Sequence, residues 1–171
     1  RMPLNGRNLI SLVAMQPGVV SNLPSTLGVG LQSLQLVYVN GQRASQNNWM
    51  LDGADNNDAG SNLGLINYVN VDAVSEVKIL RANYNAEFGR AAGGIINIVS
   101  KSGTNQFHGN VYKFFRNARL DARNTFATGQ LKDPPFKRNQ PGFTIGGPIL
   151  QDRTFFFAGY EGLFRRESAI T

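Results

Sequence analysis

The stretch from Glu87 to Thr104, EFGRAAGGIINIVSKSGT, limits the possible folds of this chain more than any other segment. It begins with a loop of small residues, continues with a short apolar run and ends in a polar stretch. A glycine-rich loop binds phosphate when it follows a strand and opens a helix whose amino terminus points at the ligand. Here Ile95 and Ile96 stand where a Walker loop needs Lys and Ser or Thr, and the β-branched run favours a strand. We therefore expect Gly93 and Gly94 to allow positive φ and close backbone approach in a tight turn before a buried strand.

Composition supports a folded chain without thiol or histidine-based chemistry. The 171 residues, 42% of them hydrophobic, suffice for a core, and the absence of cysteine excludes disulfides, thiolate metal sites and cysteine nucleophiles. His108 is the only histidine, and no serine lies in a nucleophile elbow. No set of acid, base and nucleophile can be named. We predict that the chain is not an enzyme and has no cofactor and no metal site.

The amino-terminal third predicts a short helix and two strands. Apolar residues at helical spacing between Leu9 and Val13 follow Asn5 or Asn8, either of which can cap, and Pro17-Gly18 ends the helix. From Leu34, alternating apolar residues flank Asn40-Gly41, a pair that favours a hairpin. A second turn is expected at Asp52-Gly53.

The segment DGADNNDAGSNLG, which starts at Asp52, has no hydrophobic period and is dense in turn formers, so we expect an exposed loop. Its carboxylates and amides suit a hard cation, but Ala54, Asn57 and Leu63 occupy positions where an EF-hand needs a ligand, glycine and glutamate. The alternatives are a solvated loop or a substrate contact. Beyond it, one helical turn at Asn70 to Val74 and a half-buried strand from Glu76 to Leu80 are expected, the latter near the strand Ile95 to Ser100.

After Gly103 the sequence changes to amphipathic strands rich in aromatic residues. In QFHGNVYKFFRN, one face would carry Tyr112 and Phe114 and the other Val111, Lys113 and Phe115, so neither face is cleanly apolar. TFFFAGYEGLFRR places its uncharged residues on one face and its charged residues on the other, as transmembrane barrel strands do. RNQPGFTIGGPILQD predicts a third strand, interrupted by glycines and bounded by Pro141 and Pro148.

The net charge of +6, with basic residues among aromatics in this part, would also suit single-stranded nucleic acid. No nucleic-acid-binding motif accompanies them, and anionic lipid headgroups or a barrel lumen explain them as well. Binding to nucleic acid should fall steeply with salt, whereas barrel strands should need detergent. We expect no nucleic-acid partner.

The order of these motifs resembles that of TonB-dependent outer-membrane receptors. VSEVKIL followed by EFGRAAGGIINIVSKSGT is similar to the end of the plug domain of that family. PLNGRN, VNGQR, LDGADNND, NYNAEFGRAAGG, LDARN and DRTFFFAGYEG resemble its Oar-like branch, across essentially the whole chain. The resemblance implies an α+β plug, a small mixed sheet with short helices, followed by antiparallel transmembrane β-barrel strands.

The resemblance also implies a domain organisation and roles for individual residues. Residues 1–104 would form the plug and residues 105–171 the first strands of an incomplete barrel. Turn-shaping glycines and a strand asparagine would be structural, and polar loop residues would be candidate contacts with substrate. The structural set is Gly89, Gly93, Gly94 and Asn97, and the candidate substrate contacts are Asp55, Asn56, Asn57, Asp58, Tyr84 and Asn85.

By the same resemblance, the intact protein would lie in the bacterial outer membrane and take up a polar substrate such as a glycan, peptide or chelate. Its partners would be that extracellular substrate, outer-membrane lipid and the energising TonB protein, which would pair with a segment not in this chain. The chain starts with Arg1 and would be a mature or internal fragment. The alternative function is an outer-membrane structural or adhesion protein on the same scaffold.

Overall fold

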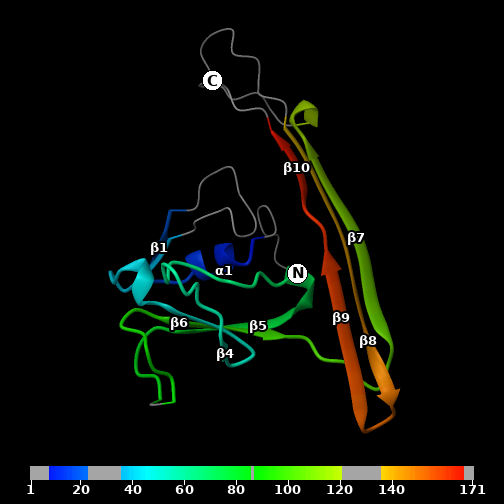
Figure 1. Cartoon of the computed structure of the whole chain (residues 1–171), viewed down its shortest axis with the longest axis horizontal. Helices are drawn as coiled ribbons and strands as arrows, with labels where there is room; N and C mark the ends of the chain where they lie inside the picture. The colour runs from blue at the N-terminus through cyan, green and yellow to red at the C-terminus, as the bar shows by residue number, and fades with distance from the viewer. Residues whose placement is uncertain (1–7, 23–35, 86, 121–135, 168–171) are drawn as a thin grey trace. The chain divides into compact units, whose positions relative to one another are not determined.

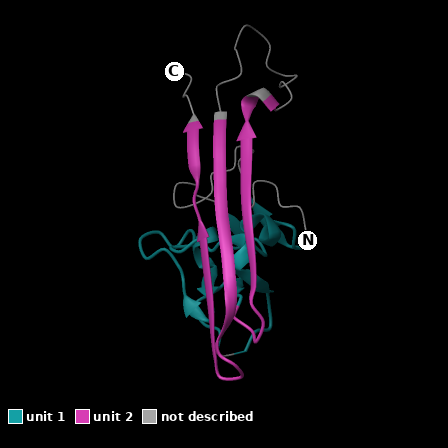
Figure 2. Ribbon diagram, turned by 90° about the vertical axis from the view of Figure 1, so that its right-hand side faces the viewer, with its two compact units in different colours: residues 1–101 teal, residues 102–171 magenta. Residues whose placement is uncertain are grey.

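The computed structural model of the protein describes residues 8–22, 36–85, 87–120 and 136–167. The chain divides into two compact units, residues 1–101 and residues 102–171, which Figure 2 shows in different colours. The first unit is α+β and the second is an antiparallel sheet, which confirms the predicted fold class. In the described part, none of the helices has the length and apolar character needed to cross a membrane.

The first unit begins with a short helix and a two-stranded sheet. Helix α1 (Ile10–Ala14) confirms the predicted helix, and the Asn8 side chain accepts a hydrogen bond of 2.9 Å from the Ile10 amide at its start. The other predicted cap, Asn5, lies outside the described residues. Gly18, at φ +76°, then turns the chain into β1 (Val19–Ser21), which pairs antiparallel with β2 (Val37–Val39).

The predicted hairpin around Asn40-Gly41 is wrong, although both residues have the positive φ of a tight turn. The strand before this turn, β2, pairs with β1, and the Asn40 amide donates to the Gly18 carbonyl at 2.9 Å. The turn leads into the 3-10 helix η2 (Ala44–Gln46), which separates β2 from the next strand, β3 (Asn48–Leu51). A hairpin needs its second strand directly after the turn, and η2 occupies that place.

The main sheet of this unit has four strands in the order β4-β3-β6-β5, of which Figure 1 labels β4, β5 and β6. The predicted turn at Asp52-Gly53 is confirmed and joins β3 to its antiparallel neighbour β4 (Ala54–Asp55). The predicted helical turn is also confirmed as η3 (Val71–Ala73), which leads into β5 (Val74–Leu80). The central strand, β6 (Ile95–Ser100), runs antiparallel to β5, as expected, and parallel to β3.

The core lies between this sheet, α1 and the two-stranded sheet. Apolar side chains from all three pack together because each element has one apolar face to bury. The fully or nearly buried members of this cluster are Leu9, Ile10, Val13, Val37, Val39, Trp49, Leu65, Ile96 and Ile98.

The second unit is an antiparallel meander in which β8 (Phe136–Leu150) is the middle strand. β7 (His108–Asn117) pairs with one edge of β8, and β9 (Thr154–Glu161) and β10 (Phe164–Glu167) follow one another along the other edge. The short η4 (Ala118–Leu120) follows β7. The prediction that glycines interrupt this third strand between two prolines is wrong, because β8 runs unbroken through Pro141. The Pro141 carbonyl still accepts from the Gly162 amide at 2.9 Å, so the proline keeps a place in the ladder.

Candidate functional site

Two polar segments of the first unit, far apart in sequence, are brought together beside its sheet. The Asn-rich loop (residues 52–67) contains β4, and the glycine loop (residues 83–94) leads into β6. The guanidinium of Arg90 lies 3.2 Å from the carboxylate of Asp55, and both side chains are largely exposed. Asn48 completes the link, because its amide donates to the Gly89 carbonyl at 3.1 Å and accepts from Asn57 at 2.8 Å. Asp55 and Arg90 therefore present opposite charges on one exposed surface.

Asn56 and Asn57 use their amides inside the Asn-rich loop. Asn56 is buried at 2% exposure and exchanges two hydrogen bonds with the Asn67 backbone, at 2.9 and 3.0 Å. Asn57 accepts from the Trp49 amide at 2.9 Å and donates to Asp55 at 2.7 Å. The expectation of an exposed loop is therefore wrong at Asn56, and Leu65, just after the predicted loop, joins the core. The roles of Asn56 and Asn57 as substrate contacts stay predictions, and both residues would need the Asn-rich loop to open.

Two carboxylates of this loop, Asp55 and Asp58, are held in their charged form. Hydrogen bonds from the backbone and then the side chain of Asn57, with a smaller contribution from Arg90, lower the pKa of Asp55 below its usual 3.8. At Asp58, hydrogen bonds from the Ser61 hydroxyl and from the Gly60 and Ser61 amides lower the pKa in the same way. Asp58 therefore closes a local turn, whereas Asp55 also reaches the glycine loop.

Acidification should loosen the Asn-rich loop while the sheet persists. Because the folded-state pKa of Asp55 and of Asp58 lies below the unfolded value, their stabilisation is complete above about pH 5 and is lost as pH falls through the folded pKa. We expect hydrogen-exchange protection, corrected for intrinsic rates, to fall at the amides of Asn57 and Gly60 between about pH 5 and pH 2. The Asn67 amide, which bonds to the uncharged Asn56 side chain, is the internal control. Equal loss at all three amides would contradict the assignment.

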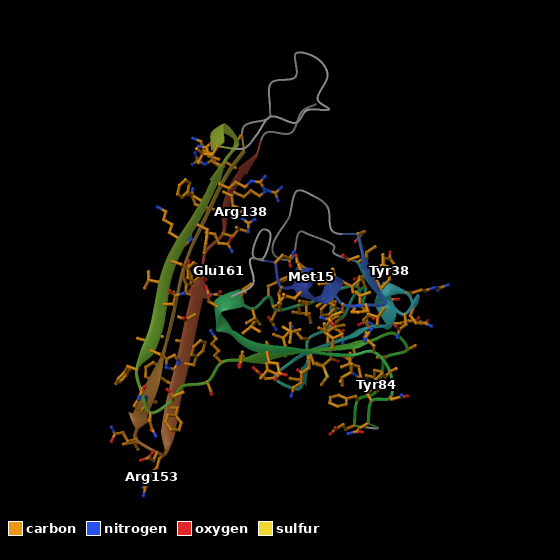
Figure 3. All side chains as sticks on the ribbon, turned by 180° about the vertical axis from the view of Figure 1, so that it is seen from behind. Met15, Tyr38, Tyr84, Arg138, Arg153 and Glu161 are labelled. Atoms are coloured by element: carbon orange, nitrogen blue, oxygen red, sulfur yellow. The ribbon has the colours of Figure 1, made fainter. Side chains whose placement is uncertain are left out.

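The glycine loop holds the other predicted contacts and one residue that the sequence reasoning missed. Tyr84, labelled in Figure 3, is half-buried and its hydroxyl donates to the Ala91 carbonyl at 2.6 Å, whereas Asn85 is exposed. Arg90 was not among the predicted site residues, yet it provides the positive charge of this surface. It has a φ of +62°, which is uncommon for arginine. The signal in the sequence was a single cation in a segment of small residues.

The paired glycines make a close approach to neighbouring elements, but the predicted positive φ is wrong for both of them. A Cβ on Gly94 would lie 2.9 Å from a Val39 methyl group, and one on Gly93 would collide with the Asn47 side chain. Asn47, almost fully buried, accepts from the Gly94 amide at 3.0 Å and donates to the Val37 carbonyl at 2.7 Å. The left-handed positions of this loop belong to Asn83 and Arg90.

Gly89 and Asn97, the other two predicted structural residues, are less buried than Gly93 and Gly94. A Cβ on Gly89 would meet nothing within 4 Å, so its structural role in shaping the turn stays a prediction. Asn97 lies in β6 and its side chain accepts from the Gly53 amide at 3.3 Å, at the turn between β3 and β4. In the described residues, no group of three or more His, Cys, Asp or Glu side chains lies close enough together to hold a metal ion.

The second unit has one face with a polar network and one face that is mostly apolar, apart from side chains such as Lys113. On the polar face, Glu161 accepts from the Tyr112 hydroxyl and from the Gln140 amide, both at 2.6 Å, and Gln140 in turn accepts from Arg138 at 2.7 Å. Figure 3 labels Arg138 and Glu161 on this sheet. On the other face, apolar side chains such as Val111 and Phe115 are exposed at 85% and 66%. A sheet with exposed apolar residues on one side and a satisfied polar network on the other is typical of a barrel wall between lipid and lumen.

Comparisons with known proteins agree with this two-part organisation. Residues 3–95 match the family described as TonB-dependent Receptor Plug Domain, and residues 99–171 match an outer membrane beta barrel domain. The chain is 34% identical over 137 residues to the TonB-dependent transporter Oar of Myxococcus xanthus, covering 76% of this chain and 13% of that protein. It is 33% identical over 88 residues to the probable TonB-dependent siderophore receptor PirA of Acinetobacter baumannii, covering 50% of this chain and 10% of that protein.

Solved structures show the same fold. The crystal structure of the siderophore receptor PirA from Acinetobacter baumannii aligns with a TM-score of 0.64 at 24% identity, over 94% of this chain and 23% of that one. A mutant of the ferric enterobactin receptor PfeA from Pseudomonas aeruginosa aligns with a TM-score of 0.55 at 22% identity, over 85% of this chain and 20% of that one. The chain thus spans less than a quarter of the length of these relatives.

Proposed function

The chain belongs to the TonB-dependent receptor family, and on that premise we propose that the intact protein takes up a polar substrate across the bacterial outer membrane through a plugged β-barrel. The observation that carries the proposal is the tandem order of a plug match and an outer-membrane barrel match in one chain. Residues 1–104 would be the plug and residues 105–171 the first barrel strands. Members of this family are transporters and receptors and not enzymes.

The receptor would receive its energy through the TonB protein, as the family description implies. TonB would engage a segment of the intact protein outside this chain. Uptake would then require binding from the extracellular side, a movement or remodelling of the plug, and release to the periplasm. Each of these steps is non-covalent.

The exposed polar groups of the two loops support a polar substrate. Asp55 and Arg90 offer one charge of each sign, and Asn85 adds an exposed amide donor and acceptor. Such a surface suits a glycan, a peptide or a chelate. Because the similar protein PirA is described as a siderophore receptor, ferric chelates are the first class to screen.

The first test is where the intact protein fractionates in a Gram-negative host and whether its migration on a denaturing gel changes on heating. Recovery in the outer membrane with heat-modifiable migration supports the receptor, since a folded barrel resists detergent. Recovery as a soluble protein would overturn it. Ligand-dependent uptake then separates a transporter from the alternative of a structural or adhesion protein on the same scaffold.

Once a transported chelate is found, the Asp55→Asn/Arg90→Gln double variant is expected to lower uptake at low substrate concentration by about tenfold, the effect of losing ~1.4 kcal/mol of binding. Lys78→Gln, an exposed charge on β5 that lies 3.7 Å from Glu76, is the matched control and should leave uptake unchanged. Radiolabelled iron accumulation measures both. Unchanged uptake in the double variant would remove these residues from the substrate path.

A further inference from the structure

The apolar face of the second unit ends abruptly in a basic row. One row across β7, β8 and β9 consists of Val111, Phe143 and Tyr160. A second row, across β7, β8 and β10, has Phe115 and Phe164 on either side of Asn139. The next row on the same face is Asn117, Lys137 and Arg166. Lys137 and Arg166 are exposed. Lys113 also lies on this face, between Val111 and Phe115, and beyond the row of Phe115 and Phe164 the change from aromatic to cationic side chains is complete within one row.

The length of the apolar face gives the position of this basic row. From Phe107 to the basic row at Asn117 the chain rises about 34 Å at ~3.4 Å per residue, and a tilt of about 35–45° in a barrel reduces this rise to a vertical span of about 24–28 Å. This span is close to the apolar band of about 25 Å in outer-membrane barrels. Lys137 and Arg166 therefore lie just past the edge of the band, at the level of lipid headgroups.

The opposite face adds positive charge at the same level. Arg116, Arg138 and Arg165 form one row across the three strands. These three side chains also have partners within the chain. Because this row and the outward row are adjacent, five basic residues lie at one end of the sheet. Figure 3 shows Arg138 toward this end and Arg153 at the turn that closes the other.

We propose that Lys137 and Arg166 form an outward-facing site for the phosphate of a net-anionic membrane-lipid headgroup. Arginine can donate two parallel hydrogen bonds to a phosphate, and the lysine ammonium adds a compact positive charge. The exposed aromatic and aliphatic face directly beside them would hold the acyl chains of the same lipid. A soluble substrate in the lumen would meet the other face, so the outward direction of this pair favours lipid.

The test is native mass spectrometry of the intact protein in detergent, titrated with phosphatidylglycerol and with zwitterionic phosphatidylcholine. The Lys137→Gln/Arg166→Gln variant is compared with Lys113→Gln/Arg153→Gln, which removes the same two charge types from the middle and the opposite end of the sheet. Heat-modifiable migration is checked for each variant, to show that a loss of lipid binding does not come from a loss of folding. Lys137→Arg is the conservative variant.

We expect the site variant to bind phosphatidylglycerol about tenfold more weakly than the unchanged protein, while the control variant and Lys137→Arg stay within about twofold. Phosphatidylcholine should bind weakly to all four proteins. Equal phosphatidylglycerol binding by the folded site variant and the unchanged protein would overturn the proposal. Displacement of the lipid by millimolar inorganic phosphate would overturn the lipid assignment in favour of a site for soluble anions.

Discussion

Replacing Gly94 by valine is expected to lower the free energy of unfolding of the plug by about 3 kcal/mol. A Cβ there would lie 2.9 and 3.1 Å from the two methyl groups of Val39, which has no exposed surface. Val39 itself belongs to β2 and to the core, so it has little room to move. The branched valine side chain would force β2 and β6 apart, and no ligand contact would be lost.

The matched control is Gly89→Ala, five positions earlier in the same loop, where a Cβ meets nothing within 4 Å and φ is not left-handed. Pulse proteolysis of the intact protein across a urea series, with fragments of the plug followed by blotting, measures both variants. Gly89→Ala should stay within about 0.5 kcal/mol of the unchanged protein. If Gly94→Val proved as stable as that control, the close approach of β2 to the glycine pair would be wrong.

Replacing Asn47 by leucine should also cost about 3 kcal/mol, although the shape and size of the side chain barely change. The Asn47 amide bridges two elements, because it donates to the Val37 carbonyl and accepts from the Gly94 amide. Leucine would leave both backbone groups buried without a partner, and each such group costs roughly 1 to 3 kcal/mol.

Asn67→Leu is the control for this change. Its side chain is exposed, and only its backbone pairs with Asn56. The same proteolysis series applies, and stability equal to that of Asn67→Leu would refute the bridging role of Asn47. Because Asn47 and Gly94 touch, the double variant should lose less than the sum of the two single losses.

Local patterns were sufficient for much of the first unit. The capped turn at Asn70, the alternation in β5 and the β-branched run of β6 each lie within a few residues, so the sequence predicted them. The pairing of β1 with β2 was missed, because its register joins Val19 to Val39 across twenty positions and depends on the shared core. The burial of Asn56 was missed for the same reason, since its partner is the backbone of Asn67.

For the second unit, the sequence predicted which face of a strand a side chain lies on, but not which residues it contacts. Strand period alone placed Tyr112 with Arg116 on one face of its strand and Glu161 on the charged face of another, and the structure places Tyr112 and Glu161 within hydrogen-bond distance of each other. Only the register across β8 shows that Gln140 joins the two and that Arg138 follows it. Pro141 was misread as a strand boundary because a proline loses one donor but keeps its acceptor, and the ladder there uses the acceptor.

The strand order β4-β3-β6-β5 also has a consequence for biosynthesis. The central strand, β6, is the last of the four to leave the ribosome, and its parallel register joins Asn48 to Ile95. Until β6 emerges, β3 and β5 each lack a neighbour, so the sheet cannot close on a partly made chain. Pairing over such a separation is also slow. This delay would leave the edges of β3 and β5 that face β6 unpaired until residues 95–100 have been made.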